Sequence, residues 1–245
     1  MKQLEVSEAA GPRSQQIGGV RGLSPAFLVV TGAFIACLIV ANIIAVKLVS
    51  FGGLILPAAV IVFPLSYLFG DVLTEVYGFA RARLVIWLGF ACNALVVLAI
   101  LAAGVLPGAP FWTAGDQAAY DRILGFTPRL LLASFLAYLV GEFVNSYVLA
   151  RLKVATRGRR LWLRTISSTL AGEGLDSLVF ITIAFYGTPV DLGTTIVSQW
   201  LFKSAYEVIA TPLTYLIVGW LKRIEGVDHF DYHTDFNPVA LQKGL

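Results

Sequence analysis

The chain is 245 residues long, with 58% hydrophobic and 13% charged residues and a mean hydropathy of +0.79. This composition excludes an ordinary soluble domain and favours one helical membrane bundle without appended modules. The net charge of +3 lies mostly in short loops, and Cys37 and Cys92 lie in apolar runs, so we expect no nucleic-acid partner, disulfide framework, metal site or cofactor.

The chain opens with a polar segment, residues 1–24, which lacks the apolar core of a signal peptide and is predicted to be a disordered tail. Six runs of about 20 apolar residues follow, and each predicts a transmembrane helix. They cover Ala26–Val46, Pro57–Tyr77, Ala82–Leu106, Arg129–Leu149, Leu163–Tyr186 and Gly193–Leu221. Residues 107–128 are rich in proline and glycine and indicate an external loop, with an interfacial piece around Phe111 and Trp112. A transmembrane domain of residues 25–222 is thus expected, followed by a cytoplasmic tail of residues 223–245.

The loops between these runs differ in their lysine and arginine content. Fourteen of the 18 basic residues fall on the side that holds both chain ends, three fall on the opposite side, and Lys203 lies within the sixth run. Cytoplasmic loops of membrane proteins are enriched in Lys and Arg, so this asymmetry places both termini in the cytoplasm. The predicted fold class is all-α, a polytopic membrane protein with six transmembrane helices in one bundle.

Seven ionisable side chains lie inside the predicted spans, where a charge is costly unless it faces the bundle interior. They are Asp71, Glu75, Glu142, Glu173, Asp176, Lys203 and Glu207. With Asn145 they form four pairs spaced three or four residues apart, so each pair shares one face of its helix. The alternative to a functional role is that these side chains form interhelical hydrogen bonds that only stabilise the bundle. Because six carboxylates cannot all be neutralised by one lysine, we predict a shared polar cavity that runs from mid-membrane toward the cytoplasm.

Two segments of the chain repeat one pattern. Gly141–Ser146 and Gly172–Ser177 both read Gly, Glu, two other residues, Asn or Asp, then Ser. Their spans run in opposite directions, so the glycines would permit close approach and the acids would face each other across a pseudo-twofold axis. Pro64 and Pro212 lie inside the second and sixth runs and predict kinks beside the cavity.

Aromatic and amide side chains are interleaved with the acids. Besides Phe63 and Tyr67, the candidates are Asn42, Asn93, Tyr77, Tyr138, Tyr147, Trp200 and Tyr206. Such a site suits a flat ring with several N–H donors, because a carboxylate accepts two parallel hydrogen bonds from an edge like that of guanine. Organic cations and protonated amines would satisfy the same site, so the residues alone leave these ligands open.

Several motifs occur in order along the chain. They are Phe63–Tyr67, Gly70–Gly78, Gly141–Ser146, Ser168–Thr169 with Gly172–Ser177, Lys203 with Glu207, Thr211–Tyr215 and Asp235–Pro238. In these motifs the sequence resembles the queuosine precursor transporter family, also called the vitamin uptake transporter family. The resemblance implies a six-helix protein of the bacterial inner membrane. It also implies import of 7-deazaguanine bases, such as 7-cyano-7-deazaguanine and its aminomethyl relative, for salvage into tRNA queuosine.

The predicted substrate-binding residues combine the acids, the lysine and two aromatic rings. They are Asp71, Glu75, Glu142, Asn145, Glu173, Asp176, Lys203, Glu207, Phe63 and Tyr67. Asp71, Asp176 and Lys203 form the expected functional core. The readers of the ring edge are expected to be Glu142, Asn145 and Glu173. Glu75 and Glu207 would tune pairing or protonation. We further hypothesise that Lys203 pairs with an acid and that ligand binding rearranges this pair.

Two alternatives to a stand-alone transporter remain. No ATP-binding Gly-x-x-x-x-Gly-Lys loop occurs, so uptake of a small deazapurine across the lipid bilayer would be facilitated or coupled to an ion gradient. A substrate-binding subunit of an energy-coupling-factor importer is the related alternative, and a homodimer is compatible with either. An intramembrane aspartyl protease would need Asp71 and Asp176 to share a proton. Its Gly-x-Gly-Asp motif is incomplete, since Leu68 stands where the first glycine belongs, and we expect no enzyme.

Overall fold

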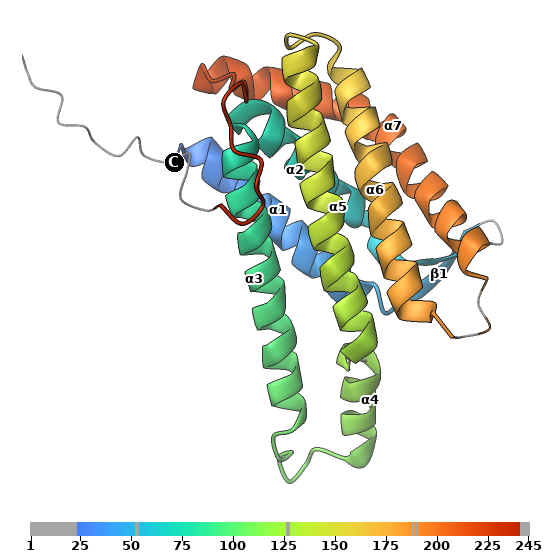
Figure 1. The fold of residues 1–245 in the computed structure, drawn as a ribbon. Coiled ribbons are helices and arrows are strands. Elements are labelled where there is room, and N and C mark those ends of the chain that lie inside the picture. Colours follow the sequence, from blue (N-terminus) through green and yellow to red (C-terminus); the bar gives the residue numbers. More distant parts are fainter. Residues whose placement is uncertain (1–23, 52–53, 126–127, 188, 190, 241–245) are drawn as a thin grey trace, which may run out of the picture.

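The protein is a helical bundle with one short β-hairpin (Figure 1). The computed structural model describes residues 24–240 apart from 52–53, 126–127, 188 and 190. The α-helices are α1 (Pro25–Ile44), α2 (Phe63–Val72), α3 (Phe79–Gly104), α4 (Ala114–Leu124), α5 (Pro128–Ala155), α6 (Leu161–Phe185) and α7 (Leu192–Glu225). The predicted tail of residues 1–24 lies almost wholly outside the described residues.

Helix α2 lies at the middle of the bundle. It packs against α1, α5 and α7, while α5 and α6 form the most extensive helix pair and α6 in turn packs on α7. The apolar core on the α1 side includes Phe34, Leu38, Leu68 and Val72, all of which are buried. Polar residues on α2, α5, α6 and α7 therefore face one another at the centre of the bundle.

Four of the described helices are long and apolar enough to cross a membrane. They are Pro25–Ile44, Phe79–Gly104, Leu132–Ala155 and Leu161–Phe185. Helix α2 has only ten residues, which corresponds to about 15 Å of rise. Helix α7 has 34 residues but carries charged groups along its length. The chain is therefore consistent with a polytopic membrane protein, and the count of six crossings stays a prediction.

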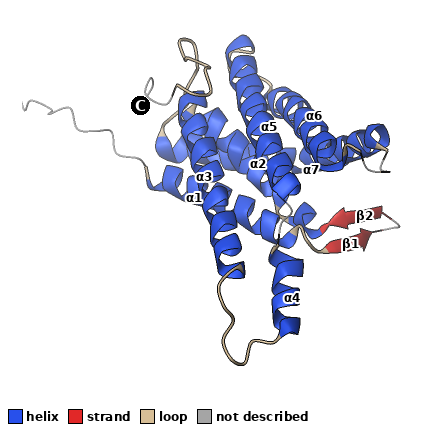
Figure 2. Ribbon diagram, turned by 60° about the horizontal axis from the view of Figure 1, so that its bottom comes forward, coloured by secondary structure: helices blue, strands red, loops and turns tan. Residues whose placement is uncertain are grey.

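The second predicted span differs from one continuous helix. Strands β1 (Leu48–Phe51) and β2 (Leu54–Pro57) form an antiparallel hairpin before it (Figure 2). The 3-10 turn η1 (Ala58–Ile61), helix α2 and the π-helical turn η2 (Leu73–Tyr77) follow in succession. Pro64 lies in the first turn of α2 rather than at an interior kink. A proline is tolerated there because the first N–H groups of a helix have no intrahelical acceptor.

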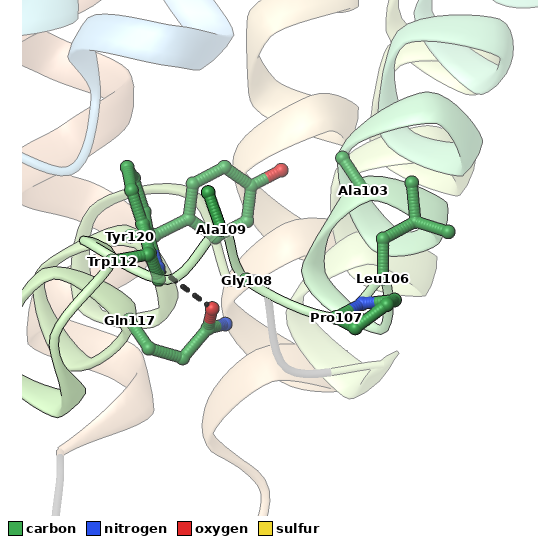
Figure 3. A pocket seen from close by; sticks show the side chains of 8 residues that line it. All are labelled: Ala103, Leu106, Pro107, Gly108, Ala109, Trp112, Gln117 and Tyr120. Atoms are coloured by element: carbon green, nitrogen blue, oxygen red, sulfur yellow. Dashed lines mark hydrogen bonds between the residues drawn. The ribbon is translucent and has the colours of Figure 1, made fainter.

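The segment predicted as an external loop contains the additional helix α4. Thr113 and Asp116 form a capping box at its start, in which each side chain binds the other residue's backbone N–H. Tyr120 fixes α4 to the end of α3 by donating to the Ile100 carbonyl at 2.8 Å. A cavity of about 260 Å³ lies between these elements (Figure 3). It is lined by Ala103, Leu106, Pro107, Gly108, Ala109, Trp112, Gln117 and Tyr120, none of which belongs to the predicted site.

Two glycines bring α5 and α6 into backbone contact, as the repeated pattern predicted. A Cβ atom on Gly141 would lie 2.9 Å from the Asp176 Cβ, and one on Gly172 would lie 2.8 Å from the Asn145 Cβ. The contacts are reciprocal, since each glycine faces the residue that follows the other glycine by one turn. This arrangement permits the close approach of the two helices that the glycines predicted, while the pseudo-twofold relation of the acids stays a prediction.

Gly172→Val is expected to lower the free energy of unfolding by about 1–3 kcal/mol, because the added side chain overpacks the α5–α6 contact. The Gly141 carbonyl oxygen would also lie 2.8 Å from the new Cβ. Thermal unfolding in detergent measures this change. Gly219→Val is the matched control, since a Cβ at Gly219 has no heavy atom of another described element within 4 Å. Equal melting temperatures for the two variants would contradict the packing argument.

After α7, residues 226–240 fold back over the turn η2 and the adjoining ends of α3 and α5, and we call this segment the strap (Figure 1). Both carboxylate oxygens of Asp231 accept from the Phe79 N–H at 3.2 Å, which caps the start of α3. Arg83 donates to the carbonyls of Asp235 and Asn237 at 2.8 and 2.7 Å. The predicted polar tail is thus bound to the bundle over its described length.

Candidate functional site

Seven of the ten predicted site residues gather in one buried cluster, which we call the polar centre. Its members are Asp71 on α2, Glu142 and Asn145 on α5, Glu173 and Asp176 on α6, and Lys203 and Glu207 on α7. The six acid and amide side chains belong to residues that are at most 6% exposed. The spacing argument therefore predicted correctly that these four helices direct their polar faces at one another.

Lys203 joins α7 to α6 within the polar centre. Its ammonium group lies 2.8 Å from a Glu173 carboxylate oxygen and forms a hydrogen-bonded ion pair with Asp176. The predicted pairing of Lys203 with an acid is confirmed, and two acids share it. Two carboxylates that share one ammonium group retain a net negative charge, so Lys203 cannot neutralise any further acid of the polar centre.

The remaining carboxyl groups of the polar centre are incompletely satisfied. Asp71 accepts from the Asn145 amide at 2.7 Å, but its second oxygen has no hydrogen-bond partner among the described residues. Glu142 is fully buried, and neither of its carboxylate oxygens has such a partner. One carboxylate oxygen of Glu207 is likewise without a partner among the described residues. Buried polar atoms in proteins are normally hydrogen-bonded, so these orphaned atoms are acceptors that a hydrogen-bond donor can still occupy.

The two predicted aromatic rings lie beside the polar centre. The Phe63 ring centroid is 4.6 Å from the Lys203 ammonium and 5.5 Å from the Tyr67 ring centroid. The Tyr67 hydroxyl is buried and has no hydrogen-bond partner among the described residues. A Cβ on Gly141 would lie 3.0 Å from this hydroxyl, so Tyr67 reaches the α5–α6 contact.

Other residues considered with the site lie elsewhere. Asn42 and Asn93 bind each other at 2.9 Å across α1 and α3. The Tyr138 hydroxyl donates to the Ile86 carbonyl, and the Tyr147 ring packs on Phe236 of the strap. These contacts belong to helix packing, which is the usual role of single polar and aromatic residues in a membrane bundle.

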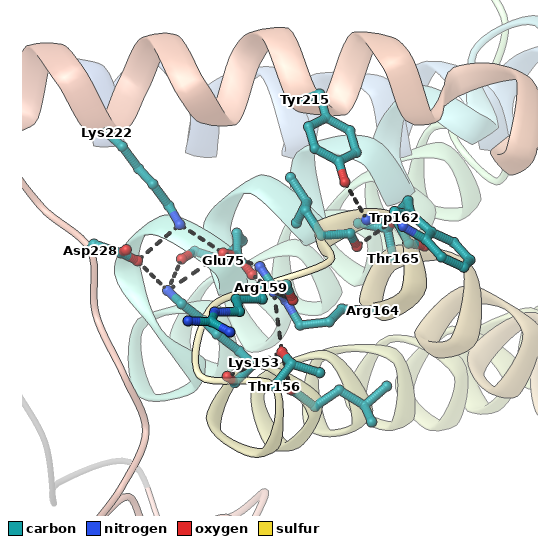
Figure 4. Close-up of polar contacts among 12 residues, drawn as sticks. Glu75, Lys153, Thr156, Arg159, Trp162, Arg164, Thr165, Tyr215, Lys222 and Asp228 are labelled. Atoms are coloured by element: carbon teal, nitrogen blue, oxygen red, sulfur yellow. Dashed lines mark hydrogen bonds and ion pairs between the residues drawn. The ribbon is translucent and has the colours of Figure 1, made fainter.

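Glu75 lies in a second cluster, which we call the cation cluster (Figure 4). Arg164 binds both carboxylate oxygens of Glu75, at 2.7 and 3.2 Å, and Lys222 binds one of them at 2.7 Å. The ammonium group of Lys153 lies 3.7 Å from Glu75 and 2.6 Å from Asp228 of the strap. The structure therefore separates Glu75 from the other predicted site residues.

Sequence reasoning treated Lys153, Arg164 and Lys222 as topology anchors in loops and did not pair them with Glu75. The Lys153 and Arg164 side chains are in fact buried, and Lys222 bridges Glu75 and Asp228. Partial burial alone would raise the pKa of Asp228, but the hydrogen bonds from Lys153 and Lys222 outweigh it and hold that pKa below its ordinary value of 3.8. The stabilisation that this depressed pKa provides is present above pH 3.8 and is lost as the pH falls through the lower, folded-state value.

The geometry weighs against a proteolytic pair of aspartates. A shared proton requires two carboxyl groups in direct hydrogen-bond contact. In the structure Asp71 is held by the Asn145 amide, whereas Asp176 is held by the Lys203 ammonium. The two aspartates thus belong to separate interactions.

Apolar helices that enclose a buried charged centre define this protein as a multi-pass membrane protein with an internal polar site. The family described as "Putative vitamin uptake transporter" matches residues 57–217, which include all ten predicted site residues. The chain belongs to this family, and it is a transport protein of the membrane.

Similar proteins carry a more specific name. A probable queuosine precursor transporter of Bacillus subtilis (strain 168) is 34% identical over 178 residues, which cover 71% of this chain and 77% of that protein. The queuosine precursor transporter of Escherichia coli (strain K12) is 31% identical over 52% of this chain and 54% of its own length. A probable queuosine precursor transporter of Haemophilus influenzae is 29% identical over 51% of this chain and 49% of its own length. No solved structure matches the chain significantly.

Proposed function

We propose that this protein imports 7-deazaguanine precursors of queuosine, such as 7-cyano-7-deazaguanine, across the bacterial inner membrane. The observation that carries this proposal is the similarity to named queuosine precursor transporters, the first of which matches over most of both chains. The polar centre supports it, because its unsatisfied acceptors suit a ring edge that consists of N–H donors.

Glu142 is the proposed reader of the guanine-like edge. As a carboxylate it has two free oxygens, which match the ring N–H and the exocyclic amine of a 7-deazaguanine. Asn145 and Asp71 offer further acceptor atoms on the neighbouring helices. Phe63 and Tyr67 supply aromatic faces on the α2 side.

We place the protein in the membrane with six crossings and both termini in the cytoplasm. The two crossings beyond the four apolar helices are the segment of η1, α2 and η2, and helix α7. In this orientation the cation cluster and the strap lie on the cytoplasmic side of the polar centre, with residues 25–222 as one transmembrane domain. The proposed activity is transport rather than catalysis, by a monomer or a homodimer.

Complementation tests this function directly. The protein is expressed in cells that neither make nor import the precursor, and 7-cyano-7-deazaguanine, its aminomethyl relative or guanine is supplied one at a time. Each of the two deazaguanines is expected to restore queuosine in tRNA, whereas guanine is not. Glu142→Gln should lower uptake at least about tenfold, because one charge-assisted acceptor is lost. Glu225→Gln, near the end of α7, is the control. The absence of queuosine with every base would overturn the proposal, and copurification of an ATPase would indicate an energy-coupling-factor subunit instead.

A further inference from the structure

The polar centre holds more acid groups than its cation can balance. Five carboxyl groups lie there with one ammonium group, so full ionisation would leave four uncompensated negative charges on the described residues. They are Asp71, Glu142, Glu173, Asp176 and Glu207. An isolated buried carboxylate is costly, and proteins avoid this cost by pairing it or by protonating it. Some of these acids must therefore bind a proton or another cation.

The contacts distinguish Glu207 from the other acids. Glu173 and Asp176 share the ammonium group of Lys203, and Asp71 accepts a hydrogen bond from the Asn145 amide. Glu142 has two carboxylate oxygens without a partner among the described residues, which suit the base. Glu207 has none of these roles. It is 3% exposed, lies one helical turn beyond Lys203, and has a carboxylate oxygen without a hydrogen-bond partner among the described residues.

The surroundings of Glu207 are acidic on both neighbouring helices. Repulsion from Asp71 on α2 and Glu173 on α6 reaches its carboxyl group. The other charged or titratable groups of the polar centre are Glu142 on α5, Asp176 on α6, Lys203 on α7 and the Tyr67 hydroxyl on α2. Lys203 is the one cation of this set, and it is already engaged by two acids. A neutral Glu207 would relieve this repulsion.

A proton is the cation that the geometry favours over a metal ion. In the part of the chain that the structure describes, no group of three or more His, Cys, Asp or Glu side chains is placed to hold a metal ion. Metal ions need several converging oxygen ligands, whereas a proton needs a single carboxyl oxygen.

We propose that Glu207 is the proton-binding site of a proton-coupled uptake cycle, and this inference rests on the proposed function. A proton from the outer side neutralises Glu207, which lowers the negative charge of the polar centre, so that Glu142 can bind the base as a carboxylate paired with the N–H donors of the base. Base and proton therefore bind cooperatively, and thermodynamic linkage makes this cooperativity reciprocal. One proton enters with each base and is released with it into the cytoplasm.

Proteoliposomes of the full chain with radiolabelled 7-cyano-7-deazaguanine test the coupling. With an outer pH one unit below the inner pH, the wild type is expected to accumulate the base about tenfold. With one proton transported per base, the tenfold ratio of proton concentrations can drive an equal ratio of base concentrations. A protonophore should reduce the ratio of inner to outer base to about one. Accumulation driven by a sodium gradient, or uptake that depends on neither the proton gradient nor the sodium gradient, would overturn the proposal that protons drive uptake. No entry at all would instead refute the proposed function.

Variants at Glu207 locate the site. Glu207→Gln is expected to lose gradient-driven accumulation and to bind the base with an affinity that no longer weakens as the pH rises. Glu207→Asp keeps a titratable group and should retain part of the accumulation, which separates a coupling role from a folding role. Glu225→Gln serves as the control on the same helix. Accumulation of the base by Glu207→Gln at the wild-type level would refute the role of Glu207. A loss of accumulation in Glu225→Gln as well would also refute it.

Discussion

Lys203→Ala is expected to weaken binding of 7-cyano-7-deazaguanine at least about a hundredfold. The substitution leaves Glu173 and Asp176 buried without their cation, which typically destabilises the fold by about 3–5 kcal/mol and removes the contact that holds these two acids in place at the site. The added negative charge also disfavours the anionic Glu142 that the base requires. Equilibrium binding of the radiolabelled base to purified protein measures the effect.

Two further variants separate binding from folding at Lys203. Lys47→Ala removes an exposed lysine and should leave binding unchanged. The double variant Lys203→Ala with Asp176→Asn relieves the charge imbalance and should recover thermal stability without recovering affinity. Unaltered uptake by Lys203→Ala would refute both the rearranging pair and its place in the functional core.

Glu75→Gln is expected to reduce the free energy of unfolding by about 3–5 kcal/mol. Arg164 and Lys153 are buried and would lose their shared anion, and the amide cannot compensate two cations. For a chain of this size such a loss corresponds to a fall in melting temperature of roughly 10 °C. The strap should also detach more readily, because the cations of this cluster hold Asp228.

Thermal unfolding in detergent and limited proteolysis of residues 226–240 report these two effects of Glu75→Gln. Glu225→Gln removes an acid from the last turn of α7 and should behave as the wild type does. If Glu75→Gln melts at the wild-type temperature and its strap resists protease, the cation cluster does not stabilise the fold in the way proposed.

Long apolar runs made most of the helices predictable. The predicted spans for α1, α3, α5, α6 and α7 overlap the observed helices, because an 18-residue or longer apolar run has few other stable conformations in a membrane. The broken segment around α2 could not be predicted this way, since hydropathy does not distinguish 3-10, α and π turns. The start of helix α4 was predictable from the capping box of Thr113 and Asp116, but a search for apolar runs does not detect such a motif.

Helical spacing located most of the polar centre but misplaced one residue. Asp71 and Glu75 are four residues apart and were expected on one helix face. The chain passes from α2 into the π-helical turn η2 between them, which changes the direction of the Glu75 side chain and brings it to Arg164. The basic residues were assigned to short loops as topology anchors, because Lys and Arg counts indicate topology and contain no information about burial.

The backbone contact between Gly141 and Gly172 constrains how the bundle can move. Because each glycine lies against the other helix without a side chain between them, α5 and α6 cannot approach further at this point. Asn145 and Asp176 lie directly beside this contact. Any change in the angle between the two helices there would therefore alter the hydrogen bond to Asp71 and the ion pair with Lys203 together.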